Sequence, residues 1–168
     1  EGVRQNRKMA ITLFKQAALE GYGDSCAILG KIYLSGDIVE RNFDKSLFWF
    51  KKGAEAGNMD GQYFTGLAFK EGKGVEQDLK KSLKWMRLAA DQRSTGAQLE
   101  LGLAYSSGAG IEKNEAQAYN WFLQSAEGGN EIAQKYSAKL LPFGAGSVKE
   151  ADHLHLAYDA EIEPKEDI

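Results

Sequence analysis

Few residues of this 168-residue chain are of the types that carry out chemistry. Cys26 is the single cysteine, and no histidine is placed to activate it as a nucleophile. His153 and His155 are the only histidines. Two residues apart on a helix, they would point about 200° apart and could not share a metal ion. The 24 Asp and Glu residues are spread along the chain, and none form a pair marked for acid–base catalysis. We therefore expect no enzyme activity, no metal site and no cofactor.

Three Gly-x-Gly segments, at residues 72–74, 108–110 and 144–146, look like phosphate-binding loops in composition. Such loops follow a strand and direct a helix N-terminus at the phosphate. Here the segments recur at a constant spacing between stretches with helical periodicity. A role in turns is therefore the favoured interpretation.

The composition narrows the class of protein. The formal net charge of −3 and the lack of a Lys/Arg block give no general attraction to nucleic acid. No apolar run approaches the roughly 18 residues that a membrane span needs. A single cysteine excludes an intrachain disulfide. We expect a soluble monomer that does not insert into membranes, and the compartment stays open between cytoplasm and periplasm.

An internal repeat of 36 residues organises the sequence. Segments that begin at Asp24, Asp60 and Gly96 align without a gap. The recurring columns include Gly30, Gly66, Gly102; Tyr33, Phe69, Tyr105; Gly36, Gly72, Gly108; Asn42, Asp78, Asn114; and Trp49, Trp85, Trp121. The frame predicts half a repeat at 1–22, full repeats at 23–58, 59–94 and 95–130, and a degenerate capping repeat with an acidic tail at 131–168, all in one repeat domain.

Each repeat predicts a pair of helices. The first helices are expected at 24–35, 60–71 and 96–107, and each stops at a glycine suited to a left-handed C-cap. The second helices are expected at 43–56, 79–92 and 115–128, each behind an Asn or Asp that can cap it. The glycine in the middle of each first helix predicts close approach of a neighbouring helix. The three tryptophans are expected to be the main buried anchors.

Residues 97–130, AQLELGLAYSSGAGIEKNEAQAYNWFLQSAEGGN, resemble the Sel-one-like repeat, a relative of the tetratricopeptide repeat. The likeness covers about residues 7–141. It departs from the family pattern at Thr65, where the pattern has Leu, and at Arg93, where it has Gly. The resemblance implies an all-α fold, a right-handed α-solenoid of antiparallel helix hairpins. It also implies an adaptor or scaffold without a general catalytic motif, often exported in bacteria. Some secreted members have a disulfide in each repeat, which one cysteine rules out here.

By analogy with tetratricopeptide arrays, a partner would bind along the side of the first helices that faces away from the core. Helical geometry places the columns of Asp24, Ala27, Lys31 and Leu34 there. The predicted groove has an apolar middle and a lysine rim, which suits an extended or helical peptide with acidic residues. Its candidate residues are Asp24, Lys31, Asp60, Tyr63, Leu67, Lys70, Leu99, Leu103, Ser106, Lys135 and Lys139.

Several interpretations stay open at this point. Leu67 and Leu99 can instead pack against a neighbouring first helix. The acidic segment 159–168 is either a solvated terminus or a segment that docks onto a partner or onto the lysine-rimmed groove. The leading functional hypothesis is a protein-interaction module, such as an adaptor, a regulator or a toxin-neutralising partner. The alternatives are an enzyme acting on cell-envelope polymers and a structural spacer within a longer repeat protein.

Overall fold

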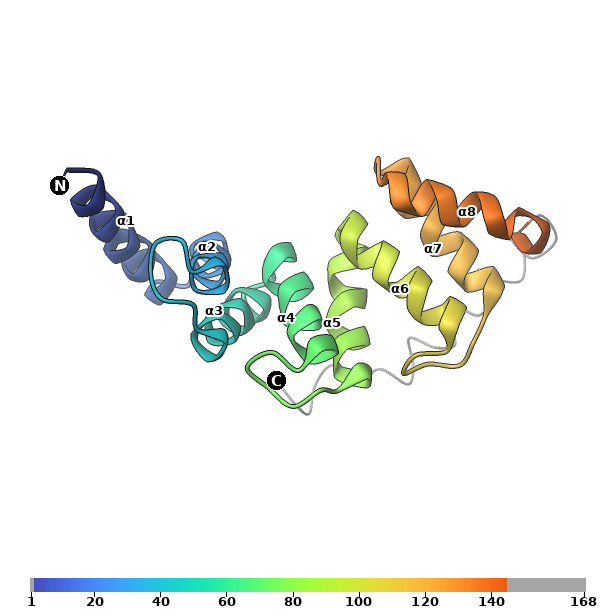
Figure 1. Cartoon of the computed structure of the whole chain (residues 1–168), viewed down its shortest axis with the longest axis horizontal. Coiled ribbons are helices and arrows are strands. Elements are labelled where there is room, and N and C mark those ends of the chain that lie inside the picture. The colour runs from blue at the N-terminus through green and yellow to red at the C-terminus, as the bar shows by residue number, and fades with distance from the viewer. Residues whose placement is uncertain (1, 145–168) are drawn as a thin grey trace. The chain divides into compact units, whose positions relative to one another are not determined.

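The computed structural model describes residues 2–144, and these residues form helices and turns without any strand (Figure 1). The helices are α1 (Gly2–Leu19), α2 (Gly23–Ser35), α3 (Phe43–Glu55), α4 (Met59–Glu71), α5 (Leu79–Asp91), α6 (Thr95–Ser107), α7 (Glu115–Glu127) and α8 (Glu131–Gly144). The prediction of an all-α protein built from helix hairpins is confirmed. His153, His155 and the acidic tail lie outside the described residues.

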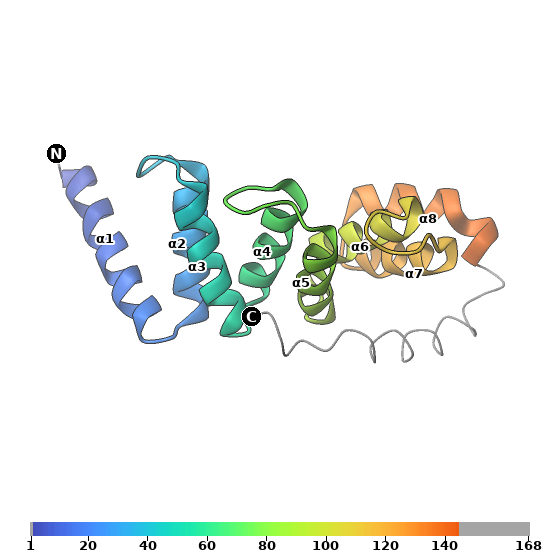
Figure 2. The ribbon, with the colours of Figure 1, turned by 90° about the horizontal axis from the view of Figure 1, so that it is seen from below.

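The chain divides into two compact units, with the boundary inside α5 between Trp85 and Met86. In residues 1–85, which we call unit 1, α1 contacts α2, α2 contacts α3, and α3 contacts α4. The first helices α2 and α4 also contact each other, so consecutive repeats lie side by side within this unit (Figure 2). In residues 86–168, which we call unit 2, α6 contacts α7 and α7 contacts α8.

The predicted caps form where the sequence placed them. The glycines after α2, α4 and α6 have φ values of 78°, 69° and 78°, in the left-handed region that favours glycine. The side chains of Asn42, Asp78 and Asn114 accept hydrogen bonds from the backbone N–H three residues on, at 2.8–2.9 Å. Gly74 and Gly110 also have positive φ in the turns between helices, which confirms the turn role of 72–74 and 108–110. The third such segment lies largely outside the described residues.

The mid-helix glycines do admit a neighbouring helix. A Cβ atom on Gly30 would lie 2.5 Å from the Phe50 ring, and one on Gly102 would lie 2.6 Å from the Phe122 ring. Real Cβ atoms do not approach other atoms so closely, so the missing side chain is what lets each aromatic ring lie against its helix. The predicted close approach is confirmed at both positions.

The anchoring role predicted for the three tryptophans needs a correction. Trp121 and Trp85 are buried, with 2% and 8% of their surfaces exposed, but Trp49 is only partly buried. The residue after each tryptophan is buried more completely: Phe50, Met86 and Phe122 are exposed by 2%, 1% and 0%. For Phe50 and Phe122 the reason is geometric, because each ring lies against a mid-helix glycine, Gly30 and Gly102.

Candidate partner-binding site

The structure leaves the predicted groove residues accessible in both units. In unit 1, α2 carries Asp24 and Lys31, while α4 carries Asp60, Tyr63, Leu67 and Lys70; all are partly or well exposed. In unit 2, α6 carries Leu99, Leu103 and Ser106, and α8 carries Lys135 and Lys139, again partly or well exposed. In unit 1 the predicted residues lie on α2 and α4, which contact each other, and therefore make one candidate surface.

One predicted column is wrong at its first member. Ala27 was expected to point away from the core, but only 3% of its surface is exposed. It lies on α2 beside Gly53 of α3, where a Cβ atom would be 3.5 Å from the Ala27 backbone nitrogen. The prediction assumed that only one side of α2 is buried. Because α1, α3 and α4 all contact α2, a smaller part of this helix is exposed to solvent than the prediction assumed.

Lys31 and Asp60, both predicted groove residues, meet across the α2–α4 contact. The Lys31 ammonium lies 2.6 Å from a carboxylate oxygen of Asp60, and the two side chains are 46% and 42% exposed. The same ammonium lies 5.4 Å from the centre of the Phe64 ring. At this distance the cation is attracted to the electron-rich face of the ring.

Phe64 is a member of this surface that the sequence did not reveal. Its ring stacks on Phe50, with centres 4.7 Å apart and planes at 14°, and makes an edge contact with Tyr63 at 5.2 Å. Tyr136 stacks on Phe122 in the same way in unit 2, at 4.9 Å and 16°. The two stacks are two repeat periods apart. The sequence indicates these stacks only through the aromatic residues at positions 64 and 136, and Glu100 occupies the equivalent position of the repeat between them.

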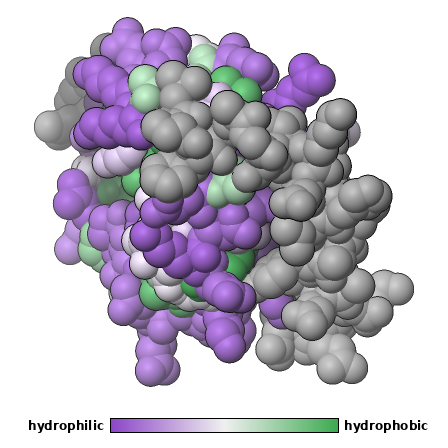
Figure 3. Space-filling view, turned by 90° about the vertical axis from the view of Figure 1, so that its right-hand side faces the viewer, coloured by the Kyte–Doolittle hydropathy of each residue, from purple (hydrophilic) through white to green (hydrophobic). Residues whose placement is uncertain are grey.

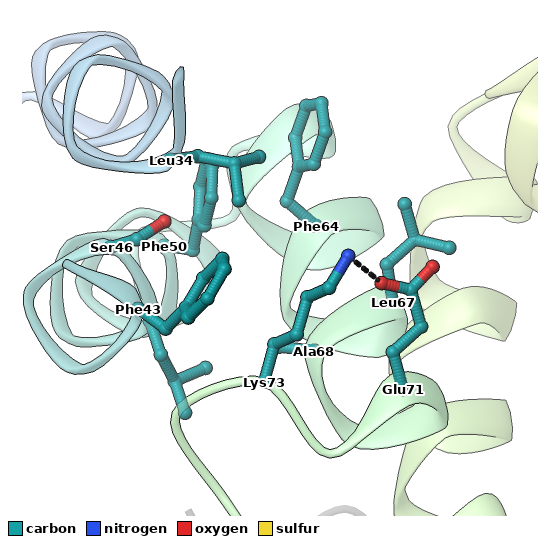
Figure 4. Close-up of a pocket in the computed structure, with 10 residues that line it drawn as sticks. Leu34, Phe43, Ser46, Phe50, Phe64, Leu67, Ala68, Glu71 and Lys73 are labelled. Carbon is teal, nitrogen blue, oxygen red and sulfur yellow. Dashed lines mark ion pairs between the residues drawn. The ribbon is translucent and has the colours of Figure 1, made fainter. Parts of the chain in front are cut away.

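A pocket of about 180 Å³ opens beside Phe64 (Figure 4). We call it the α4 pocket, because α4 supplies one wall and α2 and α3 supply the others. Its apolar lining includes Leu34 from α2, Phe43 and Phe50 from α3, and Phe64, Leu67 and Ala68 from α4. Leu34 and Leu67 belong to columns that were predicted to face a partner, so the pocket lies on the predicted surface of unit 1.

The polar groups at the α4 pocket are already engaged. The Ser46 hydroxyl donates to the backbone oxygen of Gly30 at 2.9 Å. Lys73 pairs with Glu71 at 2.5 Å, with side chains 47% and 42% exposed (Figure 4). The Lys73 ammonium also lies 5.8 Å from the centre of the Phe43 ring. The pocket therefore has an apolar interior and a charged margin.

Cys26 is poorly suited to nucleophilic chemistry. Only 2% of its surface is exposed, and its thiol donates to the backbone oxygen of Ala18 at 3.8 Å. Burial raises the pKa of the Cys26 thiol, an effect that the charge of Lys52 partly offsets. Since the thiolate is the reactive species, a raised pKa lowers the reactivity of this cysteine at neutral pH.

Other chemical roles have no visible basis in residues 2–144. Within them, no three His, Cys, Asp or Glu side chains gather in a way that could hold a metal ion. None of the helices described here has the length and apolar character needed to cross a bilayer. What the described residues do offer is an apolar pocket bordered by lysines.

Comparison with known proteins agrees with the repeat. The family profile described as "Sel1 repeat" matches residues 1–22, 23–58, 60–94 and 95–130. Among proteins with curated descriptions, no significant sequence match was found.

Three solved structures are similar to this chain. One is c5321, a protective antigen of uropathogenic Escherichia coli displaying an SLR fold: TM-score 0.69, 35% identity, covering 71% of this chain and 26% of that one. A Sel1 repeat protein from Oxalobacter formigenes has a TM-score of 0.65 and 30% identity, and the match covers 68% of this chain and 47% of that protein. Helicobacter pylori cysteine rich protein B has a TM-score of 0.63 and 27% identity, and the match covers 79% of this chain and 96% of that protein. This chain thus spans about a quarter and about half of the first two proteins. The four matched segments take in most of the sequence, and the chain belongs to the Sel1 repeat family.

Proposed function

We propose that this chain binds a protein or peptide partner through the surface formed by α2 and α4 in unit 1. Sel1 repeat proteins are generally protein-interaction modules and typically non-enzymatic scaffolds. The observation that carries the proposal is the α4 pocket, which opens among residues of the predicted binding columns. Asp24, Lys31, Asp60, Tyr63, Leu67 and Lys70 are the proposed contact residues in this unit.

The surface has the mixture of groups that partner-binding sites use. Apolar and aromatic side chains supply the area removed from water, and exposed charges at the margin supply orientation and discrimination between partners. Here Leu67 and Phe64 border the pocket, Lys73 lies at its edge over the Phe43 ring, and Lys31 lies over the ring of Phe64. In unit 2, Leu99, Leu103, Ser106, Lys135 and Lys139 are the corresponding candidates.

Affinity capture from cells that express the protein tests this function. The tagged chain is compared with the double variant Tyr63→Ala, Leu103→Ala, which removes one apolar contact from each unit. Lys84→Ala combined with Gln124→Ala is the matched control, because it also truncates one exposed helical residue in each unit. We expect the groove variant to lose most of a specifically captured partner and the control to retain it. Retention by both variants would contradict the proposed surface.

A further inference from the structure

We infer that the α4 pocket receives one apolar side chain, aromatic or branched aliphatic, from an acidic stretch of a partner peptide. This inference rests on the proposed function and specifies which feature of a partner unit 1 recognises. It follows from the volume of the pocket, the chemistry of its walls and the charges at its margin.

The volume favours a single side chain over a cofactor or metabolite. Pockets for small-molecule ligands commonly measure about 300–1,000 Å³, well above the 180 Å³ found here. An apolar cavity of about 150 Å³ in another protein holds one benzene molecule. The α4 pocket is therefore large enough for one phenyl ring or one branched aliphatic group, and too small for a drug-sized ligand.

The walls favour an apolar occupant. Phe50, which is 2% exposed, and Phe64, which stacks on it, bring two aromatic rings to the pocket, and Phe43 adds a third that is 37% exposed (Figure 4). The hydroxyl proton of Ser46 is committed to a backbone oxygen. A polar ligand group would lose its hydration in this pocket without a replacement partner, at a cost that an apolar group avoids.

The margin favours acidic residues beside the anchor. Lys31 and Lys73 hold their ammonium groups over the rings of Phe64 and Phe43, both of which line the pocket. Their pairings with Asp60 and Glu71 are between side chains that are 42–47% exposed. Exposed ion pairs contribute little to stability, so a partner carboxylate can share or replace them at little cost.

The sign of the charge in unit 1 supports the same choice. On the α2–α4 surface, Lys31, Lys70 and Lys73 are balanced by the three carboxylates of Asp24, Asp60 and Glu71, so the excess of positive charge belongs to the unit as a whole. Over the whole unit, residues 1–85 carry 14 Lys and Arg against 11 Asp and Glu. A basic peptide would meet an excess of like charge here, whereas an acidic one meets complementary charge.

Titration of the full-length, ¹⁵N-labelled protein with three capped pentapeptides tests the inference. The first has a central Phe between two pairs of Glu, the second has Ala in place of Phe, and the third has Lys in place of Glu. We expect the first peptide to give saturable amide shifts at Leu34, Phe64 and Leu67, and the other two to bind at least about tenfold more weakly. Equal binding of the Lys-flanked peptide, or shifts confined to other residues, would overturn the inference.

Two matched variants locate the anchor. Leu67→Asp places a carboxylate in the pocket wall, and Leu88→Asp makes the same change on α5, at a half-buried position of unit 2 outside the proposed binding surface. We expect at least a tenfold loss of affinity for the Glu-Phe peptide in the first variant and no change in the second. Unchanged binding by a folded Leu67→Asp protein would contradict the pocket assignment.

A surface variant keeps the test decisive if Leu67→Asp fails to fold. Lys73→Glu changes an exposed side chain at the pocket margin, and Lys113→Glu, at an exposed lysine that is also ion-paired in unit 2, is its control. We expect Lys73→Glu to weaken binding of the Glu-flanked peptide at least about fivefold and to strengthen binding of the Lys-flanked one. If Lys73→Glu leaves the affinity for both peptides unchanged, the proposed role of the lysines at the pocket margin is wrong.

The inference and the proposed function can fail separately. If Leu67→Asp retains a captured partner that the single variant Tyr63→Ala loses, the α2–α4 surface binds partners but the pocket does not anchor them. If instead Leu67→Asp abolishes self-association seen by sedimentation and no peptide binds, the pocket serves a second copy of this chain and the acidic-peptide inference is wrong.

Discussion

The two units contain the same packing arrangement. In unit 1, Gly30 on one helix admits the Phe50 ring, and Phe64 stacks on that ring. In unit 2, Gly102 admits Phe122, and Tyr136 stacks on it. The glycines belong to a recurring column, whereas Phe64 and Tyr136 belong to a column that holds Ile28 and Glu100 elsewhere, so the glycine contact is a property of the repeat and the second ring is an addition to it.

The differences lie in the columns that vary. Unit 1 has Gly61 where unit 2 has Ala97 and Ala133, and it has Thr65 where unit 2 has Leu101. Residues 1–85 carry an excess of three basic residues, with 14 against 11, whereas residues 86–168 carry 7 against 13. Most of the acidic excess of the second half lies in residues 145–168, which carry 2 basic and 7 acidic residues, so the repeats of unit 2 are close to neutral where those of unit 1 are basic.

Unit 2 also shows how little apolar surface the shared framework exposes. Among the residues coloured in Figure 3, hydrophilic ones predominate and hydrophobic ones show in small separated patches. The exposed large apolar residues of α7 and α8 include Leu123, Ile132 and Tyr136, at 38%, 55% and 37% exposure. Scattered apolar residues of this kind are usual on soluble proteins, in contrast to a pocket with several aromatic walls.

The largest expected effect separates two tryptophans of the same column. Trp121 is 2% exposed in unit 2, whereas Trp49 is only partly buried in unit 1. Trp121→Ala should lower the free energy of unfolding by about 3–5 kcal/mol, because it removes a fully buried ring and leaves a cavity. Trp49→Ala should cost clearly less. Urea unfolding followed by circular dichroism measures both, and equal losses would contradict the difference in burial.

A second effect concerns the closer helix contact in unit 1. A Cβ atom on Gly61 would lie 2.6 Å from the Ala54 backbone nitrogen and 2.7 Å from the Gly53 carbonyl carbon. Because backbone atoms cannot swing aside, Gly61→Ala should destabilise the protein by about 1–3 kcal/mol. The helix preference of Ala over Gly alone would give about 1 kcal/mol of stabilisation. A more stable Gly61→Ala protein in thermal unfolding would show that α3 and α4 are less close than described.

Thr65 offers a test in the stabilising direction. It is fully buried, and its hydroxyl has no hydrogen-bond partner. Thr65→Val keeps the shape and removes the unsatisfied hydroxyl, so it should raise the free energy of unfolding by about 1 kcal/mol. At the equivalent position of unit 2, Leu101→Thr introduces a buried hydroxyl and should be destabilising. Chemical denaturation of both variants decides the point, and a loss of stability in Thr65→Val would contradict it.

Arg93 departs from the repeat in its backbone. Its φ of 67° is in the left-handed region, where Gly57 and Gly129 stand in the neighbouring repeats with φ values of 79° and 93°. Arg93→Gly relieves this strain but makes the unfolded chain more flexible, so the expected net gain is small, about 0.5–1 kcal/mol. A lower melting temperature for Arg93→Gly would mean that other contacts of the arginine outweigh the strain.

The smallest expected effect on stability is at the Lys31–Asp60 pair. Its members are 46% and 42% exposed, and exposed pairs contribute at most about 1 kcal/mol. Lys31→Met should therefore change the free energy of unfolding by less than about 1 kcal/mol. The same variant should weaken the binding of an acidic peptide. If unfolding at low and high salt shows a larger loss, the pair has a structural role that the proposed binding role does not include.

The sequence predicted the features that depend on short stretches of chain. The C-cap glycines, the capping residue Asn42 and the close approach at Gly30 all follow from the properties of one residue at a known place in a helix. The period then assigned the same roles to each repeat. These predictions needed no knowledge of how one hairpin packs on the next.

The features that were missed depend on packing between repeats. The burial of Ala27 requires the contacts that α2 makes with three other helices. The α4 pocket requires Leu34 and Phe64, from consecutive repeats, to face a common space. The sequence did not predict the role of Phe64, because the equivalent positions of the neighbouring repeats hold Ile28 and Glu100 and the residue type does not recur.

Site-specific photo-crosslinking in cells can locate a bound partner at the α4 pocket. The photoreactive residue p-benzoylphenylalanine replaces Leu67 in one protein and Leu103, the same column of unit 2, in another. We expect a discrete crosslinked partner at position 67 in clear excess over position 103, and its loss when Lys73→Glu is added. Equal crosslinking at the two positions, or none at position 67 when capture still yields a partner, would contradict binding at the α4 pocket.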